Sequence, residues 1–385
     1  MKSLPDYELN RREFMDKLGR VGAGTCVACS VGGVAVSLPA AKASPPIHGR
    51  EVDFYEQLSG KRIQCFVCPM HCVLEDGQTC FCRTRTNYGG KLFTDAYDNP
   101  CVLRVESVEK TPLNHFRPGS RCIMLGVGGC NLRCIYCQNW EVSQQFPEQV
   151  AKYELTPDQA VDAAVKRGID TIAFNFTEAV VFLEYATDIA RLAKKKGLHV
   201  VCATAAFIEP EPLIAFAEHV DAFAVTLKGF TEEFYHDSIG VKLAPVLTAI
   251  KTIKHRTSSW LELISLIVPG YNEDMNEFRR MCGWIRQNVG AETPLHFARF
   301  VPEYKLKDVE QTPVPVMEEA KRVALQGGMK YVYLSNIAPH PDTNTYCPRC
   351  KRPLIERHGF EILRRWDNGQ GRCPTCRITL PGVWT

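Results

Sequence analysis

From Arg121 onward the sequence alternates between two kinds of segment, and this alternation restricts the fold more than any other feature. Six apolar runs of strand length are separated by segments whose apolar residues recur with the period of an α-helix. The runs cover residues 121–127, 171–175, 199–204, 222–227, 261–268 and 295–300. Strands that alternate with helices form parallel sheets through right-handed crossovers. The sequence therefore predicts an α/β fold, a partial (β/α)6 TIM-like barrel.

The segments between these runs carry helix signals. Thr156 and Pro157 provide an N-cap and a first-turn proline, so a helix is predicted from there to about Lys166. Further helices are predicted for residues 180–196, 210–218, 232–237, 242–255, 275–287 and 315–326, and a last short strand for 330–334. In barrels of this kind ligands bind at the carboxyl ends of the strands. A site is therefore expected in the loops that follow the strands.

The loop after the first strand holds three cysteines with the spacing C-x3-C-x2-C, namely Cys130, Cys134 and Cys137. Thiolate is the usual protein ligand of iron–sulfur clusters, and three thiolates can hold three corners of a 4Fe-4S cube. No fourth cysteine follows at ferredoxin spacing, so one iron would be open to a small molecule. Gly128 and Gly129 would let the backbone approach that ligand closely. A zinc knot or three unrelated core cysteines is the alternative.

A second cysteine group lies upstream of the predicted barrel. Four of its thiols have metal-ligand spacing: Cys65, Cys68, Cys72 and Cys82. They are adequate for a zinc or an iron–sulfur site, with Cys80 and His71 as spare ligands. The alternative is a loop that is stapled by disulfides or holds no metal. The chain has 18 cysteines, and their clustering favours metal sites over a disulfide framework.

A third cysteine group lies near the carboxyl end of the chain. Two C-x2-C pairs supply four thiols: Cys347, Cys350, Cys373 and Cys376. Paired knuckles of this kind are a strong zinc-ribbon signal, and four thiolates would close the coordination sphere of a structural ion. Zinc is favoured, and iron as in rubredoxin comes second. The chain balances 46 basic against 43 acidic residues and has no basic block, so no nucleic-acid partner is expected.

Motifs around the three-cysteine loop narrow the interpretation. Residues 109–120 read EKTPLNHFRPGS, residues 128–140 read GGCNLRCIYCQNW, and the upstream group reads C-x2-C-P-x2-C. In this order the motifs resemble the radical S-adenosylmethionine (SAM) enzyme of the AmmeMemoRadiSam system, a family similar to the pyruvate formate-lyase activating enzymes. The resemblance runs from about Phe54 to Trp384. It implies a 4Fe-4S cluster on the three cysteines and SAM on the open iron.

The resemblance also implies a reaction and a set of contacts. In that family SAM is reductively cleaved to a 5′-deoxyadenosyl radical, which abstracts hydrogen from a substrate, and a low-potential electron donor is needed. The implied target is a glycyl radical enzyme or a small molecule handled within the AmmeMemoRadiSam system. The residues expected to contact SAM are Gly128, Gly129, Tyr136, Glu178, Lys228 and Asn272.

Three strand-end loops depart from the family pattern. Relatives carry Asn-Glu-Pro, Thr-Asn-Gly and Asp-Leu-Lys. This chain keeps Glu178 and Lys228, but it departs from the pattern at Ala179, at residues 203–206 and at Thr226. Glu178 could equally act on a helix dipole, Lys228 could be solvated, and Asn272 could belong to a simple Pro-Gly turn. Two other interpretations therefore stay open. One is a non-catalytic iron–sulfur electron-transfer or metal-stabilised scaffold protein, and the other is a zinc-ribbon interaction module with a disabled barrel.

The amino-terminal residues are typical of a targeting segment. Residues 10–14 read NRREF, similar to a twin-arginine export motif; a weakly hydrophobic stretch covers 21–41, and residues 41–43 offer an A-x-A cleavage site. The twin-arginine route carries folded proteins, which suits a cluster that is built in the cytoplasm, so a periplasmic or exported protein is expected. The alternative is an uncleaved cytoplasmic chain. No other apolar run approaches the length of a membrane span.

The sequence thus predicts four parts. They are a twin-arginine-type targeting segment (1–46), a cysteine-rich region (47–120), the partial barrel (121–340) and a zinc-ribbon-like module (341–385).

Overall fold

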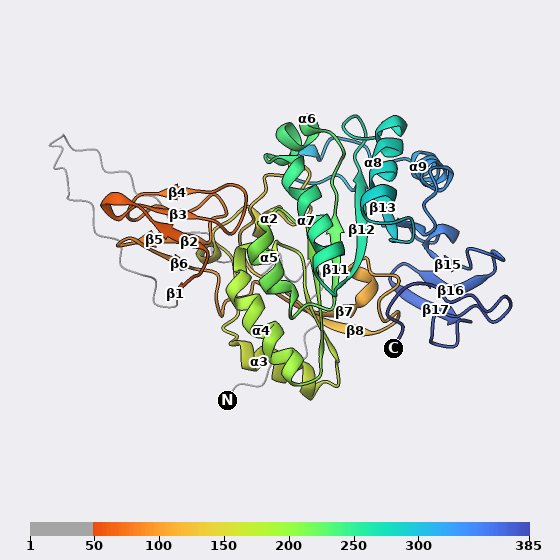
Figure 1. Cartoon of the computed structure of the whole chain (residues 1–385), viewed down its shortest axis with the longest axis horizontal. Coiled ribbons are helices and arrows are strands. Elements are labelled where there is room, and N and C mark those ends of the chain that lie inside the picture. Colours follow the sequence, from red (N-terminus) through yellow and green to blue (C-terminus); the bar gives the residue numbers. More distant parts are fainter. Residues whose placement is uncertain (1–48) are drawn as a thin grey trace, which may run out of the picture. The chain divides into compact units, whose positions relative to one another are not determined.

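An eight-stranded sheet organises the part of the chain that the computed structural model describes, residues 49–385. Its strands are β7 (Val102–Ser107), β8 (Arg121–Gly126), β9 (Thr171–Phe174), β10 (His199–Thr204), β11 (Ala222–Thr226), β12 (Trp260–Ile267), β13 (Leu295–Arg299) and β14 (Val332–Ser335). They lie side by side in sequence order, from β7 at one edge to β14 at the other (Figure 1). Strands β8 to β14 run parallel, and β7 pairs antiparallel with β8.

The prediction of a partial, barrel-like parallel sheet is confirmed. All six predicted strands are present, with ends that differ from the predicted ones by at most one residue. Two further strands enlarge the sheet. Strand β14 was predicted as a strand without a place in the sheet, and β7 lies in the predicted cysteine-rich region, yet both are hydrogen-bonded to the parallel strands.

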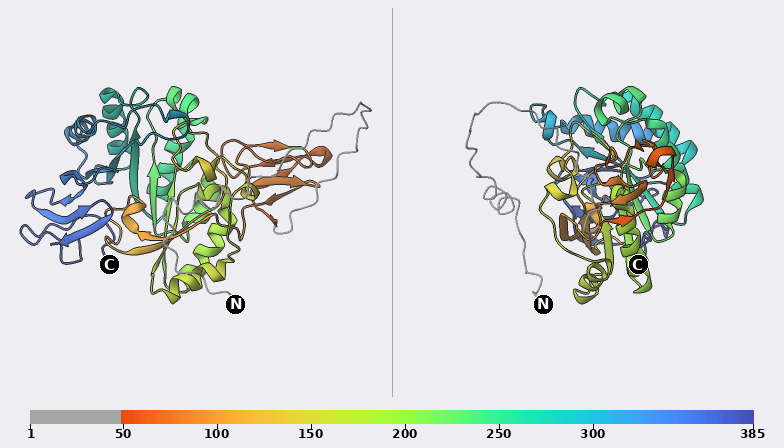
Figure 2. Two further views of the ribbon diagram at one scale, coloured as in Figure 1. Left: turned by 180° about the vertical axis from the view of Figure 1, so that it is seen from behind. Right: turned by 90° about the vertical axis from the view of Figure 1, so that its left-hand side faces the viewer.

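Helices pack along one face of this sheet (Figures 1 and 2). They are α2 (Trp140–Ser143), α3 (Pro157–Lys166), α4 (Leu183–Lys195), α5 (Pro210–Ala217), α6 (Glu232–Phe234), α7 (Leu243–Arg256), α8 (Met275–Asn288) and α9 (Val314–Gln326). The predicted start of α3 is confirmed. The Thr156 hydroxyl accepts a hydrogen bond from the backbone N–H of Gln159, and the side-chain oxygen of Gln159 accepts one from the backbone N–H of Thr156. Helix α4 begins later than predicted, since residues Ala179–Phe182 form a separate turn of 3-10 helix.

Residues of each strand point alternately to two different cores. Large side chains such as Ile172 and Phe174 face the helices. Small side chains such as Ala173 and Ala224 face the inner side of the sheet. Phe116, from the segment that precedes β8, packs against this inner face. The EKTPLNHFRPGS segment therefore contributes to the interior of the partial barrel.

A buried polar network closes the barrel at the amino-terminal ends of the strands. Its centre is Glu262 of β12, which is fully buried. One carboxylate oxygen accepts hydrogen bonds from the backbone N–H of His115 (2.7 Å) and the indole of Trp260 (3.0 Å). The other accepts from the backbone N–H of Asn114 (3.0 Å) and from His296 Nε2 (2.8 Å). We call these five residues the basal network.

The carboxyl-terminal residues are attached to the basal network through His115. Its Nδ1 donates to the carbonyl of Pro381 (2.7 Å), so its Nε2 accepts from the hydroxyl of Tyr333 (2.6 Å). The backbone N–H of Val383 donates to the carbonyl of His115 (2.8 Å). Burial lowers the pKa of His115 to about 4, which agrees with a neutral ring that donates once and accepts once.

Three small sheets flank the main one. Two lie in the amino-terminal part: β1 (Arg50–Glu51), β5 (Arg85–Tyr88) and β6 (Lys91–Thr94) form one, and β2 (Tyr55–Gln57), β3 (Ile63–Cys65) and β4 (Val73–Leu74) form the other. The third contains β15 (Thr345–Tyr346), β16 (Pro353–His358) and β17 (Glu361–Arg365). The predicted targeting segment lies outside the described residues. From residue 49 onward, no helix is both long and apolar enough to cross a bilayer.

Candidate active site

The three-cysteine loop directly follows β8, at the carboxyl end of the parallel strands. Cys130 and Cys134 are buried, and Cys137 is partly exposed. The loop backbone is held by hydrogen bonds to the carbonyls of Ser238 (3.0 Å) and Ile239 (2.8 Å), which follow α6. Burial raises the pKa of Cys134 to about 11, and the positive charge of a nearby lysine acts in the opposite direction. The fold thus brings the predicted cluster ligands to the edge where a ligand is expected.

The glycine pair before these cysteines is required by protein packing. A Cβ on Gly128 would lie 2.9 Å from Val150 Cγ2. A Cβ on Gly129 would lie 2.5 Å from Thr84 Cγ2 and 2.9 Å from the carbonyl oxygen of Cys82, and Gly129 also has a φ of +105°. The side on which a Cβ would project is therefore occupied by the chain itself. Contact of these glycines with SAM stays a prediction.

Glu178 joins the loops that follow β9 and β10. One carboxylate oxygen accepts from the Thr204 hydroxyl and the other from the backbone N–H of Ala205, both at 2.7 Å. Burial raises the pKa of Glu178, although both hydrogen bonds and the charge of Lys228 oppose this rise. The carboxylate is therefore fixed in place beside the three-cysteine loop, where its charge also acts on Cys130 and Cys134.

Lys228 and Tyr136 approach each other at the same edge of the sheet. Lys228 follows β11, and its Nζ lies 5.9 Å from the centre of the Tyr136 ring. Burial favours a lower pKa for Lys228, but the negative charges of Cys134 and Glu178 raise that pKa above its ordinary value. Tyr136 is buried and stacks on Phe234, and its hydroxyl has no hydrogen-bond partner among the described residues. A cation and an unpaired hydroxyl thus lie beside the three cysteines.

Asn272 holds two strand-end loops together. Its amide nitrogen donates to the carbonyls of Lys228 (2.7 Å) and Leu266 (2.8 Å). Its amide oxygen accepts from the backbone N–H of Val268 (2.7 Å). Asn272 therefore fixes the backbone of Lys228, and a direct contact of Asn272 with SAM stays a prediction.

The four carboxyl-terminal cysteines converge as a metal site would require. Their sulfur atoms all lie within 4.8 Å of one another. The sulfurs of Cys347 and Cys376 are 3.4 Å apart, and those of Cys350 and Cys373 are 3.5 Å apart. Zinc–sulfur bonds of about 2.3 Å in a tetrahedron place the sulfurs about 3.8 Å apart. These cysteines could hold a metal ion, and the identification of the module as a zinc ribbon stays a prediction.

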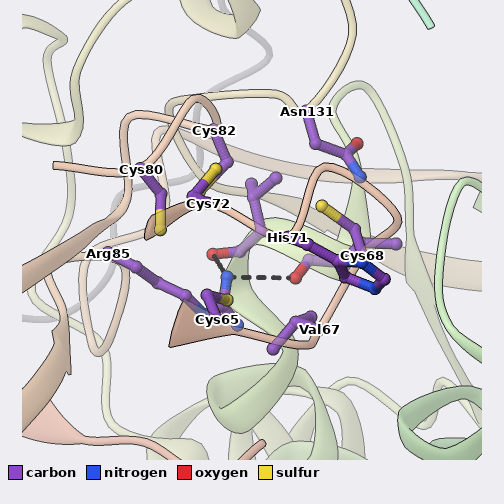
Figure 3. Close-up of a pocket in the computed structure, with 11 residues that line it drawn as sticks. Cys65, Val67, Cys68, His71, Cys72, Cys80, Cys82, Arg85 and Asn131 are labelled. Carbon is purple, nitrogen blue, oxygen red and sulfur yellow. Dashed lines mark hydrogen bonds between the residues drawn. The ribbon is translucent and has the colours of Figure 1, made fainter. Parts of the chain in front are cut away.

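The upstream cysteines line one pocket, which we call the amino-terminal cysteine pocket (Figure 3). Its lining includes five cysteines together with other side chains: Cys65, Cys68, Cys72, Cys80, Cys82, His71, Arg85, Asn131, Val67, Val180 and Val181. Contacts with the thiols of Cys65, Cys72 and Cys82 raise the pKa of Cys80 well above its ordinary value. Asn131, which also lines the pocket, donates through its amide nitrogen to the carbonyl of Phe207 (2.8 Å). His71 lies beside Glu209, with 2.9 Å between Nε2 and Oε1.

The structure adds residues that sequence reasoning did not assign to a site. Arg85 and Asn131 both line the amino-terminal cysteine pocket, and Thr204 anchors Glu178. Asn131 sits between Cys130 and Cys134 within a quoted motif, so its position there was the available signal. Nothing in the sequence around Arg85 indicates that its side chain is buried.

Comparison with known proteins agrees with this arrangement. Residues 124–285 match the family model described as the radical SAM superfamily. The chain is 39% identical over 328 residues to the uncharacterized protein MJ0808 of Methanocaldococcus jannaschii, covering 85% of this chain and 97% of that protein. It is 25% identical over 235 residues to the pyruvate formate-lyase 1-activating enzyme of Escherichia coli strain K12, covering 56% of this chain and 93% of that enzyme.

Among solved structures, a radical SAM methyltransferase from Sphaerobacter thermophilus superposes with a TM-score of 0.44 at 11% identity, covering 58% of this chain and 68% of that one. The conclusion about family rests on the full-length relative and on the matched domain. The chain belongs to one family with MJ0808 and carries a radical SAM domain.

Proposed function

We propose that the protein is a radical SAM enzyme that cleaves SAM reductively and uses the product to abstract hydrogen from a substrate. The observation that carries this proposal is the set of three cysteines at the carboxyl end of β8, beside a lysine and an anchored glutamate. When bound there, a 4Fe-4S cluster with SAM supplies one-electron cleavage of SAM to a 5′-deoxyadenosyl radical.

The residues at this edge fit such a group. Cys130, Cys134 and Cys137 offer thiolates, which are the protein ligands of iron–sulfur clusters. The partly buried cation of Lys228 suits a carboxylate, and the Glu178 carboxylate suits an ammonium group. SAM carries both groups in its methionyl part. We therefore assign Lys228 and Glu178 to the two ends of that part.

Three neighbouring residues keep this arrangement rigid. Thr204 donates to Glu178, and Asn272 bonds to the Lys228 carbonyl, so each charged residue is positioned by a neighbouring loop. The unpaired hydroxyl of Tyr136 is a buried polar group that a bound ligand can satisfy. Burial of Tyr136, Cys130 and Cys134 also limits the access of water to the site.

The direct test is the release of 5′-deoxyadenosine. The protein is purified without oxygen, reconstituted with iron and sulfide, and incubated with dithionite and SAM. We expect 5′-deoxyadenosine from the wild type and none from Cys134→Ala. Cys282→Ala, which changes a buried cysteine in α8, is the matched control and should retain activity. An intact cluster that neither cleaves SAM nor changes its EPR signal with SAM would support the non-catalytic electron-transfer alternative.

We further propose that the enzyme works in the AmmeMemoRadiSam system, with a glycyl radical enzyme or a small molecule as its target. The support is the motif order along the chain together with similarity to an enzyme that is named for activating pyruvate formate-lyase 1. Anaerobic incubation with SAM, reductant and a candidate glycyl radical enzyme should generate a glycyl radical EPR signal. Retention of the deuterium of a glycine-labelled partner, with no label in 5′-deoxyadenosine, would exclude that partner.

Export by the twin-arginine route and a zinc ion at the carboxyl-terminal cysteines complete the proposal. The twin-arginine-like motif and the A-x-A sequence of residues 41–43 support export. The convergence of four sulfur atoms supports zinc. Sequencing the amino terminus of the protein from its native cell tests export with cleavage, because a start at Met1 contradicts cleavage. Metal analysis of the purified protein tests the presence of zinc.

A further inference from the structure

The amino-terminal cysteine pocket differs from the carboxyl-terminal metal site in how its sulfur atoms are spaced. The four carboxyl-terminal sulfurs lie within 4.8 Å of one another, close to the spacing around a single zinc ion. Within residues 49–385, neither the amino-terminal cysteines nor Cys130, Cys134 and Cys137 form a group of three that meets this spacing. The amino-terminal set thus resembles the proposed cluster ligands and not the proposed zinc ligands. Wider spacing suits a cluster of several metal atoms.

The pocket adjoins the three-cysteine loop directly. A Cβ on Gly129 would lie 2.9 Å from the carbonyl oxygen of Cys82, so the two loops are in backbone contact. Asn131 of the three-cysteine loop lines the pocket together with Cys68. The pocket is also lined by exposed His71 and partly exposed Cys72. The pocket therefore has residues of the protein surface and a residue of the three-cysteine loop in its lining.

A buried positive charge accompanies these thiols. Arg85 is almost fully buried and pairs with Glu184 (2.8 Å), and it donates to the carbonyls of Val180 (3.2 Å) and Val181 (3.1 Å). Its Nε has no hydrogen-bond partner among the described residues, although it is buried. An unpaired buried N–H beside thiols is costly unless it meets an acceptor. A cluster with thiolate and sulfide sulfurs offers such an acceptor.

We infer that the amino-terminal cysteine pocket binds a second iron–sulfur cluster and passes electrons to the cluster of the three-cysteine loop. Its ligands are Cys65, Cys68, Cys72 and Cys82. A low-potential electron-carrier protein gives one electron to the second cluster, which is reduced and then reoxidised as it reduces the SAM-binding cluster. One electron moves at each step and no proton is transferred. The relay rests on the proposed function, whereas the presence of the cluster does not.

Cys80 has a different place in this site. In Figure 3 it lies on the side of the pocket away from Cys68, with the other labelled cysteines between them. We therefore leave Cys80 outside the ligand set.

The presence of the second cluster is tested without the first. The full-length variant in which Cys130, Cys134 and Cys137 are all replaced by alanine is reconstituted without oxygen. We expect it to keep about four iron and four sulfide per chain, the content of one 4Fe-4S cluster. Adding Cys68→Ala should remove them, with an unchanged circular dichroism spectrum as the folding control. Zinc in place of iron, or no metal in the pocket, would overturn the inference and leave the proposed function untouched.

The relay is tested by the choice of reductant. With the three-cysteine loop intact, Cys68→Ala should release 5′-deoxyadenosine at least tenfold more slowly than wild type when a reduced ferredoxin or flavodoxin is the donor. With dithionite, a small reductant that reaches the SAM-binding cluster directly, the loss should be much smaller. Equal rates with the protein donor refute the relay. Loss with both donors while the first cluster is intact also refutes it, because the pocket would then serve the reaction in another way.

The place of Cys80 outside the ligand set is tested by metal content. Cys80→Ala should keep the iron of the second cluster. Loss of iron from Cys80→Ala with retention in Cys68→Ala would replace Cys68 by Cys80 in the ligand set and overturn the assignment.

Discussion

Replacing Glu262 by glutamine should destabilise the protein although Glu262 is remote from the three-cysteine loop. Glu262 is fully buried, and each of its carboxylate oxygens accepts two hydrogen bonds within the basal network. Glutamine keeps one accepting oxygen and turns an NH2 group toward the other two donors. If that group faces His296, the imidazole can change tautomer and accept, but the backbone N–H of Asn114 loses its acceptor.

The size of the effect follows from these contacts. One buried donor without a partner costs about 1–3 kcal/mol, and hydrogen bonds to a neutral group are weaker than those to a charge by about 1 kcal/mol. We therefore expect Glu262→Gln to lower the free energy of unfolding by about 3 kcal/mol. Glu262→Ala leaves every donor of the network unpaired and should cost about 5 kcal/mol or more, a large part of the 5–15 kcal/mol typical of a folded domain.

Urea unfolding of the reconstituted protein, followed by tryptophan fluorescence, measures this effect. The matched control is Glu292→Gln, because Glu292 is exposed and pairs with exposed Lys330 (2.8 Å). Such a surface pair contributes at most about 1 kcal/mol, and often less. A Glu262→Gln variant that unfolds within 0.5 kcal/mol of the control, about the error of such a comparison, would refute the role of the basal network.

Four further outcomes are expected. Lys228→Met should weaken SAM binding at least tenfold in calorimetry with the reconstituted protein, because the cation proposed to meet the SAM carboxylate is lost. Cys376→Ser should remove one zinc per chain in elemental analysis and lower the melting temperature, while the visible spectrum of the iron–sulfur clusters persists. Gly129→Ala should cost about 1–3 kcal/mol in urea unfolding, because its Cβ would lie 2.5 Å from Thr84 Cγ2 at positive φ; Thr84→Gly should recover part of that loss. The free energy of unfolding should decrease as the pH is lowered from 6.5 to about 4, because His115 takes up a proton in the unfolded chain but stays neutral in the folded one. The His115→Gln variant should show a smaller decrease over the same range.

The parallel strands could be predicted from sequence because they are buried on both faces, which makes them continuous apolar runs between helices. The edge strand β7 could not, since its residues are only half-buried and its pairing with β8 depends on a partner further along the chain. Helix α3 was predictable in detail because Thr156, Pro157 and Gln159 encode its start locally. Where the information is local, sequence reasoning succeeds.

The site shows the same division between local and long-range information. The spacing of Cys130, Cys134 and Cys137 is local, and its place after β8 follows from the strand pattern. The packing role of Gly129 could not be predicted from the neighbouring sequence, because Gly129 packs against residues that lie far upstream of it. Asn272 looked like part of a turn or a SAM contact, and only the structure shows that its amide holds the Lys228 backbone. Partners that are distant in sequence determine these roles.

The attachment of the carboxyl terminus to the basal network has a consequence for the order of synthesis. The backbone N–H of Val383 donates to the carbonyl of His115, and the backbone N–H of Arg117 donates to the carbonyl of Val383 (2.8 and 2.6 Å). The floor of the barrel therefore contains residues that are synthesised after every strand of the main sheet. Strands β7 to β14 can pair during translation, but the interior around His115 closes only after residue 383 is free. The floor of the barrel is thus completed after its sheet, and a chain that is cut before Pro381 should have the sheet but lack the floor.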